Sequence, residues 1–490
     1  MKGDNMSLKI ALVTYELFPY AKLGGVSDVV AAWGKYLGKK HDVRMFIPCY
    51  NNLNTGGEFL NRVDEVQNIP ISMGADTYLF SLWTLNYPNT NTPVYFIDCP
   101  HYFHRNTICT NDEDEGMRFA FFCRAILETC QRMKWAPDIL HCNEWQTGLL
   151  PIYLRTIYSW DKMFNSTKTI LSLHNLGYQG VFDSNIVQKI GLNNEWKYLP
   201  QEDLSYGKIN FLKIGLVYAD TLTTVSKTYA EEILQPQYGY GLSSILNARK
   251  DDLVGIPHGI DNDIWDPETD KCIDYNYNIH DFSGKERNKQ KVLQDWNLPY
   301  NPDIPTCGII SRLVSQKGFQ LLMPIIEDMF MKNEIQFLVQ GTGDDYYVDY
   351  FRYLSAKYPN QVRFFAEYNE ERAHKIMAAS DMFLMPSEYE PCGLTQLIAQ
   401  KYGTLPIVRY TGGLADTVMP FYTGKDKGTG FVFEHFQSDA LDWAIHEACA
   451  TFKKKVVWES LMIQAMAQDY SWEHQIQAYE DLYKKLIGKK

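Results

Sequence analysis

The chain is organised around DMFLMPSEYEPCGLTQLIAQKYG, the segment Asp381–Gly403. Its first part, Met382–Met385, is a short apolar run before a proline, which is typical of a fully buried parallel strand. Its last part, Leu394–Tyr402, has the apolar spacing of a helix, and Gly403 is a suitable residue to end it. The segment therefore predicts a strand, a turn and a helix within an α/β sheet.

The turn between this strand and this helix carries Glu390, Cys392 and Gly393. In open α/β sheets, ligands bind beyond the carboxyl ends of the strands, and a helix N-terminus offers free N–H groups to a phosphate. Gly393 would let a phosphate approach the backbone, and Glu390 places a carboxylate beside it. An ordinary connection with a surface glutamate and a buried cysteine fits the same residues, so this segment alone leaves both interpretations open.

Length and composition set the broad class of the protein. The chain has 490 residues, which is too long for one hydrophobic core and indicates two or three domains. A formal net charge of −12 argues against nucleic acid or an anionic membrane as the main partner. The ten cysteines lack CxxC pairs and metal-type spacing, and no apolar run is long enough to span a bilayer. We therefore expect a soluble, cytoplasmic protein without a bound metal.

The beginning of the chain shows the same strand–loop–helix order. Ile10–Thr14 reads as a strand, and the apolar residues from Val26 onward form one face of a helix. Between them, Lys22 precedes Gly24 and Gly25 at the start of the helix. A diglycine in this place can expose N–H groups to an anion, and Lys22 adds a positive charge. A tight turn with a solvated lysine is the alternative interpretation.

Alternating strands and helices continue along the chain in two series. In the first series, a strand exit leads to Glu144 and Trp145, and the next strand ends at His174, followed by Asn175 and a glycine-rich loop. Such a polar loop is more typical of a ligand-facing surface than of a core turn. The other expected elements are strands at 43–47, 94–97, 139–141, 169–173 and 220–226, a short strand and turn within 253–261, and a helix at 117–133.

A polar connector, roughly 262–305, separates the first series from the second. The second series has strands at 306–311, 335–340, 361–365, 382–385 and 405–408, and a second diglycine at a helix start. Arg312 and Lys317 follow its first strand, a spacing that suits a diphosphate because arginine binds it with two parallel hydrogen bonds and lysine adds a point charge.

At this point the chain resembles the bacterial glycogen synthase and plant starch synthase family of retaining glucosyltransferases. The resemblance covers essentially the whole chain, and its matching stretches occur in the family's order: KLGGVSDVV, HNLGYQG, HGIDNDIWDP, SRLVSQKGFQLL, SEYEPCGLTQLIAQKYGTLPIV, TGGLADTV and YSWEHQ. The resemblance implies an α/β fold of two Rossmann-like domains facing across a deep cleft. The acceptor domain would span 1–252 together with a crossover helix at 469–490, and the donor domain 253–468.

The same resemblance implies a donor site for ADP-glucose. Lys22, Gly24 and Gly25 would close over the nucleotide phosphates, with Asp28 nearby, while Arg312 and Lys317 would neutralise the diphosphate leaving group. Tyr368 would stack on adenine, and Glu390 would face the donor glucose. The remaining donor contacts implied are His258, Cys392, Gly393, Leu394 and Thr395.

The resemblance further implies that His174 lies near the donor glucose, with an α-1,4-glucan as acceptor and no cofactor or metal. Glu144, Trp145 and Asn175 are the acceptor-side candidates. Three positions depart from the family: Glu144-Trp145-Gln146 replaces Asp-Trp-His, His258 replaces Asn, and Leu23 replaces Thr in the diglycine loop. At these positions we expect contacts that differ from those of the family.

Three alternatives to this function stay open. The enzyme could use UDP-glucose or a smaller acceptor, or the chain could be a glucan-binding protein without activity. The set Lys22, Arg312, Lys317 and Glu390 argues against the latter, because glucan binding alone needs no diphosphate site. A phosphorylase would need a pyridoxal-binding lysine motif, which we do not find.

Overall fold

The computed structural model describes residues 7–488 except 111, 333, 423 and 426. The chain folds into two compact units. The first unit contains the described residues up to Val225, together with Ala230–Ile256 and the C-terminal residues from Gln475. The second unit contains Ser226–Tyr229 and Pro257–His474.

The first unit is built on a twisted sheet that is parallel through seven of its strands. The order across this sheet is β12 (Leu253–Gly255), β11 (Thr221–Thr224), β8 (Lys168–Leu173), β7 (Ile139–Asn143), β1 (Lys9–Val13), β2 (Asp42–Pro48), β6 (Pro93–Asp98), β5 (Asp76–Asn86) and β3 (Asn61–Arg62). The strand β4 (Ile69–Met73) pairs antiparallel with β5, and β9 (Val181–Asp183) pairs with β10 (Lys208–Asn210).

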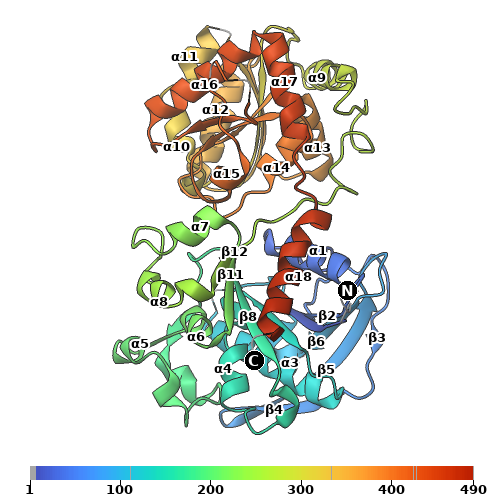
Figure 1. Ribbon diagram of the computed structural model, residues 1–490, viewed down its shortest axis with the longest axis vertical. Helices are drawn as coiled ribbons and strands as arrows, with labels where there is room; N and C mark the ends of the chain where they lie inside the picture. Colours follow the sequence, from blue (N-terminus) through green and yellow to red (C-terminus); the bar gives the residue numbers. More distant parts are fainter. Residues whose placement is uncertain (1–6, 111, 333, 423, 426, 489–490) are drawn as a thin grey trace. The chain divides into compact units, whose positions relative to one another are not determined.

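The helices of this unit connect and cover the sheet (Figure 1). They are α1 (Val26–Leu37), α2 (Pro100–Phe103), α3 (Glu115–Arg132), α4 (Leu150–Arg155), α5 (Gln201–Ser205), α6 (Phe211–Tyr218), α8 (Ser243–Ala248) and the short turns η1 (Trp145–Thr147), η2 (Lys162–Phe164), η3 (Ser184–Gln188), η4 (Trp196–Tyr198) and η5 (Lys250–Asp252). Two further helices, α7 (Lys227–Glu232) and α18 (Trp472–Gly488), each contain residues of both units.

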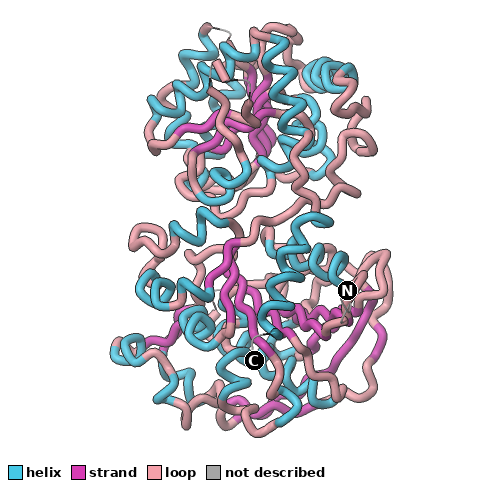
Figure 2. The backbone as a smooth tube through the Cα atoms, viewed as in Figure 1, coloured by secondary structure: helices cyan, strands magenta, loops and turns pink. Residues whose placement is uncertain are grey.

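The second unit has a fully parallel six-stranded sheet with helices on both faces (Figure 2). The order is β15 (Val362–Phe365), β14 (Gln336–Gln340), β13 (Thr306–Ile310), β16 (Met382–Met385), β17 (Leu405–Arg409) and β18 (Phe431–Phe433). Its helices are α9 (Ser283–Asp295), η6 (Ser315–Lys317), α10 (Phe319–Leu322), α11 (Ile326–Met331), α12 (Asp345–Lys357), α13 (Glu370–Ala379), α14 (Thr395–Lys401), α15 (Gly412–Thr417), α16 (Ser438–Phe452) and α17 (Lys455–Met466).

Each sheet has a point where the strand order reverses. In the second unit the chain moves outward from β13 to β15, then starts again at β16 beside β13 and continues to β18. In the first unit the reversal lies between β1 and β7. Loops diverge from such a point at the carboxyl ends of the two strands, and this leaves room for a ligand.

The structure confirms the two βα series, and the segment from β16 to α14 closely follows its prediction. The antiparallel strands β4 and β5 were not predicted, and the presumed connector contains the helix α9. The division between the units also differs from the sequence-based boundaries. Leu253–Gly255 pairs with β11 in the first sheet, so the first unit extends to Ile256. Ser471 pairs with Ile260, so the second unit extends to His474.

The last helix, α18, packs within the first unit from Gln475 onward. The hydroxyl of Tyr483 lies 2.7 Å from Nδ1 of the buried His141, whose Nε2 lies 2.6 Å from the Ser172 hydroxyl. The ring of Tyr479 packs against Trp33 on α1. In Figure 1 the red α18 accordingly runs beside the blue α1. The final segment of the chain thus completes the core of the unit with which the chain begins.

Candidate active site

The reversal point of the second unit brings together a cation and a carboxylate predicted from the sequence. Lys317 follows β13 and Glu390 follows β16, and Lys317 Nζ lies 2.5 Å from Glu390 Oε2. The Ser387 hydroxyl donates a second hydrogen bond to the same oxygen, at 3.0 Å. Glu390 is buried, so its charge is balanced by these donors rather than by water.

Two glycines let the loops of this site approach one another. Gly318 has a left-handed backbone, with φ of 75°, and a Cβ placed there would lie 1.9 Å from the Pro386 carbonyl oxygen. The second diglycine serves the same purpose, since a Cβ on Gly413 would lie 1.9 Å from the Cys392 carbonyl oxygen. The Gly413 N–H also donates to the Glu390 carbonyl oxygen at 3.0 Å. These contacts fix the backbone on both sides of Glu390.

The turn after Glu390 leads into α14. Gly393 has φ of 71°, the left-handed conformation that glycine adopts without strain. Leu394 is the N-cap of the helix, and the Thr395 hydroxyl contacts Met385 Sδ at 3.2 Å. Cys392 is buried, and burial raises the pKa of its thiol to about 12, which keeps the thiol protonated. The turn therefore offers backbone groups rather than a reactive thiol.

The other donor-side candidates of the second unit differ in exposure. Arg312 is exposed at the end of β13. Tyr368 is 59% exposed beyond β15, with its hydroxyl bonded to Glu370, so one face of its ring is accessible for stacking. His258 is instead buried, with its ring 6.0 Å from that of Trp472. Arg312 and Tyr368 are thus exposed to solvent, whereas His258 belongs to the packed interior.

In the first unit, the buried Glu16 lies beside the diglycine loop. Its Oε2 accepts hydrogen bonds from the backbone N–H groups of Leu23 and Gly24, at 2.5 and 2.6 Å. The sequence analysis expected this loop to expose its N–H groups to an anion, and for these two groups the structure shows otherwise. Gly25 is exposed and a Cβ there would meet nothing within 4 Å, so the open side of the loop lies at Gly25.

Lys22 is the cation of this loop. Its side chain is 43% exposed and its Nζ lies 2.9 Å from the Asp28 carboxylate, on the first turn of α1. Both residues were predicted for the site, and the structure places them together. An exposed ion pair of this kind is weak, because water screens both charges. Lys22 can therefore exchange Asp28 for another anion at little cost.

Glu144 occupies the exit of β7 in a strained conformation. Its φ of 61° and ψ of −176° lie in a region that residues other than glycine avoid. Its Oε1 accepts hydrogen bonds from the backbone N–H groups of His174 and Asn175, at 2.5 and 2.9 Å. Burial raises the pKa of this carboxyl to about 8, with the charge of Glu16 acting in the same direction. Glu144 thus holds the loop after β8 and is protonated at neutral pH.

His174 is buried at the end of β8. Its Nε2 lies 2.8 Å from Asn143 Oδ1, and burial lowers the pKa of the ring to about 3. His174 is therefore neutral at physiological pH, so it can take part in hydrogen bonds but does not carry a positive charge. Asn175, the next residue, accepts a hydrogen bond from the Gly177 N–H at 2.9 Å, which orders the turn of the loop.

The two residues after Glu144 point into the protein. The ring of Trp145 packs against Phe119 and Phe182, and a Cβ on Gly180 would collide with it. Gln146, which replaces the family's histidine, is buried with its Nε2 3.6 Å from Cys109 Sγ. Trp145 therefore packs beneath the backbone at Gly180, with its ring buried.

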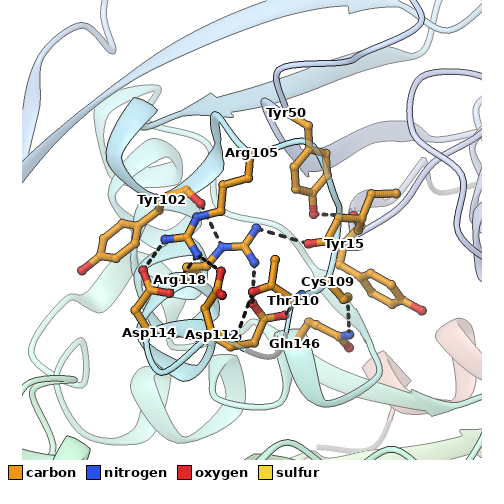
Figure 3. A network of polar contacts seen from close by, with 12 residues as sticks. Tyr15, Tyr50, Tyr102, Arg105, Cys109, Thr110, Asp112, Asp114, Arg118 and Gln146 are labelled. Atoms are coloured by element: carbon orange, nitrogen blue, oxygen red, sulfur yellow. Dashed lines mark hydrogen bonds and ion pairs between the residues drawn. The ribbon is translucent and has the colours of Figure 1, made fainter.

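Figure 3 shows the loop that lies next to these residues. Arg105 and Arg118 hold it, Arg105 through Asp112 and Asp114, and Arg118 through Glu115 and the backbone. The Tyr50 hydroxyl donates to the Tyr15 carbonyl oxygen at 2.8 Å. This hydrogen bond fixes the backbone at Tyr15, the residue before Glu16.

Glu16 is the residue of this site that the sequence analysis missed. It follows β1 by three positions, just as Glu390 and Glu144 follow their strands closely. The signal was a carboxylate in an otherwise apolar strand exit, TYELFPYA, where burial makes an acid costly unless donors surround it. A single acidic residue carries that signal only weakly.

The described residues contain one group of side chains with metal-ligand chemistry. Atoms of Asp270, Cys272 and His374 lie within 4.8 Å of one another. His374 Nδ1 lies 2.8 Å from Asp270 Oδ2, and the Tyr402 hydroxyl donates to the same oxygen at 2.6 Å. These hydrogen bonds account for the arrangement as a structural network. Among the helices of the described residues, none is both long and apolar enough to cross a membrane.

The comparisons with known proteins place the chain in a family. Residues 9–248 match the starch synthase catalytic domain, and residues 293–458 match the glycosyl transferases of group 1. The class defined by the two α/β units and by these matches is a glycosyltransferase. Glycogen synthases from Thermosipho melanesiensis and Thermotoga maritima are 41% and 40% identical to this chain, over 99% and 98% of it and over 100% and 99% of their own length. The chain belongs to the glycogen and starch synthase family.

Solved structures show the same relationship. The catalytic domain of starch synthase IV from Arabidopsis thaliana, bound to ADP and acarbose, aligns with a TM-score of 0.90 and 32% identity, covering 99% of this chain and 100% of that one. Sucrose-phosphate synthase from Thermosynechococcus elongatus aligns with a TM-score of 0.61 at 19% identity, which reflects a shared fold. The fold class and the glycogen or starch synthase function expected from the sequence are confirmed.

Proposed function

We propose that the protein transfers glucose from ADP-glucose to the non-reducing end of an α-1,4-glucan with retention of configuration. The observation that carries this proposal is the pairing of Lys317 with the buried Glu390, with Arg312 on the same loop, where the strand order reverses. Starch synthase IV from Arabidopsis thaliana was solved with ADP and acarbose, and this supports an adenine nucleotide and a glucan as ligands.

The chemistry of the proposed reaction separates charge. The bond between the anomeric carbon and the diphosphate oxygen breaks, leaving negative charge on the diphosphate and positive charge on the sugar ring. Arg312 and Lys317 stabilise the first, and the Glu390 carboxylate stabilises the second. A bond then forms from the acceptor hydroxyl to the same face of the sugar, and its proton passes to the leaving phosphate oxygen. His174, held neutral by burial, contributes hydrogen bonds to the sugar.

We further propose that these cations make a metal or cofactor unnecessary. Arg312 and Lys317 supply the charge that a divalent ion gives to other phosphate sites. Excess EDTA should then leave the rate of transfer unchanged. A loss of activity that Mg²⁺ or Mn²⁺ restores would contradict this part of the proposal.

The test is transfer of radiolabelled glucose to glycogen, with initial rates from ADP-glucose and UDP-glucose measured side by side. We expect faster transfer from ADP-glucose and incorporation into polymer rather than into maltose-sized sugars. Faster transfer from UDP-glucose would identify UDP-glucose as the donor. Incorporation into maltose-sized sugars would identify a small acceptor. No transfer by folded protein would indicate a glucan-binding protein without activity.

A further inference from the structure

The side chain of Glu16 is enclosed by the loop that connects β1 to α1. It is fully buried, and its carboxylate accepts two short hydrogen bonds from consecutive N–H groups, those of Leu23 and Gly24. Hydrogen bonds to an ionised acceptor are about twice as strong as neutral ones. The Ser27 hydroxyl adds a bond to the Gly24 carbonyl oxygen at 2.7 Å. The inner side of the loop is therefore fixed by one buried acid and one hydroxyl.

The arrangement divides the loop into an occupied side and an open side. A Cβ on Gly24 would lie 3.4 Å from Glu16 Oε1, whereas a Cβ on Gly25 would meet nothing within 4 Å. Lys22 is bonded to the exposed carboxylate of Asp28 and not to Glu16. The open side thus presents an exposed glycine, and Lys22 adds an exposed ammonium group three residues earlier in the same loop.

Two sets of influences act on the charge of Glu16 in opposite directions. Burial raises the pKa of Glu16 and Asp28 acts in the same direction, while the N–H groups of Leu23 and Gly24 and the hydrogen bond from Tyr15 oppose them. The pKa of Tyr15 is raised by burial and by the charges of Glu16 and Glu144. An acid that served only to fill space would be costly here. The hydrogen bonds from the two N–H groups offset part of this cost.

We propose that Glu16 is a positioning residue for the donor's diphosphate, holding the inner N–H groups of the Lys22–Gly25 loop so that Lys22 and Gly25 face the ligand. This inference rests on the proposed function. Glu16 does not touch the donor, because it is enclosed on the other side of the loop. Its effect is on the affinity for the nucleotide, by keeping the loop in the binding conformation before the nucleotide arrives.

The test uses the full chain and three variants. Glu16→Ala removes both acceptor contacts, and Glu16→Gln keeps the shape and one acceptor oxygen but not the charge. Glu128→Gln is the matched control, a half-buried acid on α3 of the same unit that accepts a hydrogen bond from the Tyr158 hydroxyl. Two quantities are measured: hydrogen exchange of the Leu23 and Gly24 amides, and the Kd of ADP by calorimetry.

We expect Glu16→Ala to speed exchange of these two amides and to weaken ADP binding by about tenfold or more, since each charged hydrogen bond contributes on the order of 1.4 kcal/mol, a tenfold effect. Glu16→Gln should fall between Glu16→Ala and the natural protein, with KM for ADP-glucose rising while kcat changes less. Faster exchange with unchanged ADP affinity would make Glu16 a structural residue only. Unchanged exchange would overturn the inference outright.

The transfer assay separates this inference from the proposed function. Suppose that ADP binds the natural protein, that the Glu16 variants bind it more weakly, and that no glucose is transferred. The positioning role then stands and the proposed reaction fails. If transfer proceeds with identical KM in all four proteins, the reaction stands and the positioning role fails. Should Glu16→Ala not fold, the nearly isosteric Glu16→Gln decides, with its melting temperature compared with that of Glu128→Gln.

Discussion

At the scale of single residues, the candidate sites of the two units contain three buried acids, and the charge of each is compensated in a different way. Glu390 pairs with an ammonium group, Glu16 accepts backbone N–H groups, and Glu144 is held in its protonated form. All three follow closely after a strand that borders a reversal point. The sequence predicted Glu390 and Glu144, because a polar residue after an apolar strand is conspicuous. It could not show which donors each acid would meet, since the Lys317 ammonium and the N–H groups of His174 and Asn175 come from other strand exits, and the nearer Leu23 and Gly24 depend on how the loop folds.

Glu390 provides the first prediction. Glu390→Ala should lower kcat by at least about 10²-fold, because one preorganised electrostatic contact contributes about 2.7 kcal/mol or more to the transition state. Steady-state rates with ADP-glucose and glycogen are the measurement. Glu388→Gln, on the same loop but exposed, is the control and should stay within about twofold. Near-normal turnover in Glu390→Ala would remove this carboxylate from the catalytic set.

Glu144 predicts a pH dependence of stability. Its pKa of about 8 in the folded protein lies above its ordinary value, so its contribution to stability is complete at low pH and is lost as the pH rises through about 8. Between about pH 5 and about pH 8, the loss of this contribution lowers the free energy of unfolding by roughly 1.4 kcal/mol per pH unit. Glu144→Gln stays neutral and should show a growing advantage in melting temperature over that range. Parallel profiles of the two proteins would contradict the raised pKa.

At the scale of elements, α9 shows why part of the fold could not be predicted. The segment SGKERNKQKVLQD has no continuous apolar face, so the sequence analysis assigned it to a connector. Its buried side instead uses Lys285, Asn288 and Lys289 together with Val292 and Leu293. Lys289 pairs with Asp381 at 2.8 Å. Lysine stems can line an interior when their ammonium groups find partners, and those partners are invisible in a local pattern.

Lys285 is the clearest case. Its Nζ lies 2.9 Å from the Tyr402 carbonyl oxygen and 2.8 Å from the Thr404 hydroxyl, and it also contacts two carbonyl oxygens of α13. It thereby joins the C-terminal ends of α13 and α14. Burial lowers the pKa of this amine to about 7.

We expect Lys285→Met to destabilise the second unit by about 2–4 kcal/mol, because buried carbonyl oxygens lose their donor. Chemical denaturation followed by tryptophan fluorescence measures this, since Trp265 and Trp296 belong to the same unit. The control is Lys291→Met on the exposed side of the same helix, where a pair with Asp295 is lost at little cost. Equal stability of the two variants would show that Lys285 makes no net contribution.

At the scale of the whole molecule, the apolar strand runs predicted both parallel sheets, because a strand buried on two faces needs a continuous apolar segment. The antiparallel strands β4 and β5 were missed, since many of their side chains are exposed. The position of α18 was implied only by the family resemblance. No local pattern states which core a helix will join, although Tyr479 and Tyr483, one turn apart, mark its buried face.

Tyr483 gives the prediction at this scale. Tyr483→Phe removes the hydroxyl beside His141 and should destabilise the first unit by about 1–3 kcal/mol, since a buried ring nitrogen loses its partner. Calorimetry is the measurement, and the melting transition of the first unit should shift to lower temperature. Tyr206→Phe, at a largely exposed tyrosine of the same unit, is the control. A shift no larger than that of the control would mean that water replaces the lost hydroxyl.

The return of α18 to the first unit has a consequence for how the protein is made. A ribosome releases the beginning of a chain long before its end, and domains usually fold as they emerge. Here the first unit lacks Gln475–Gly488 until the second unit has been synthesised, so Trp33 and His141 remain without the side chains of this helix during that time. The nascent protein therefore passes through a state in which the apolar residues that this helix covers are accessible to chaperones, and a product that lacks the helix would keep them accessible.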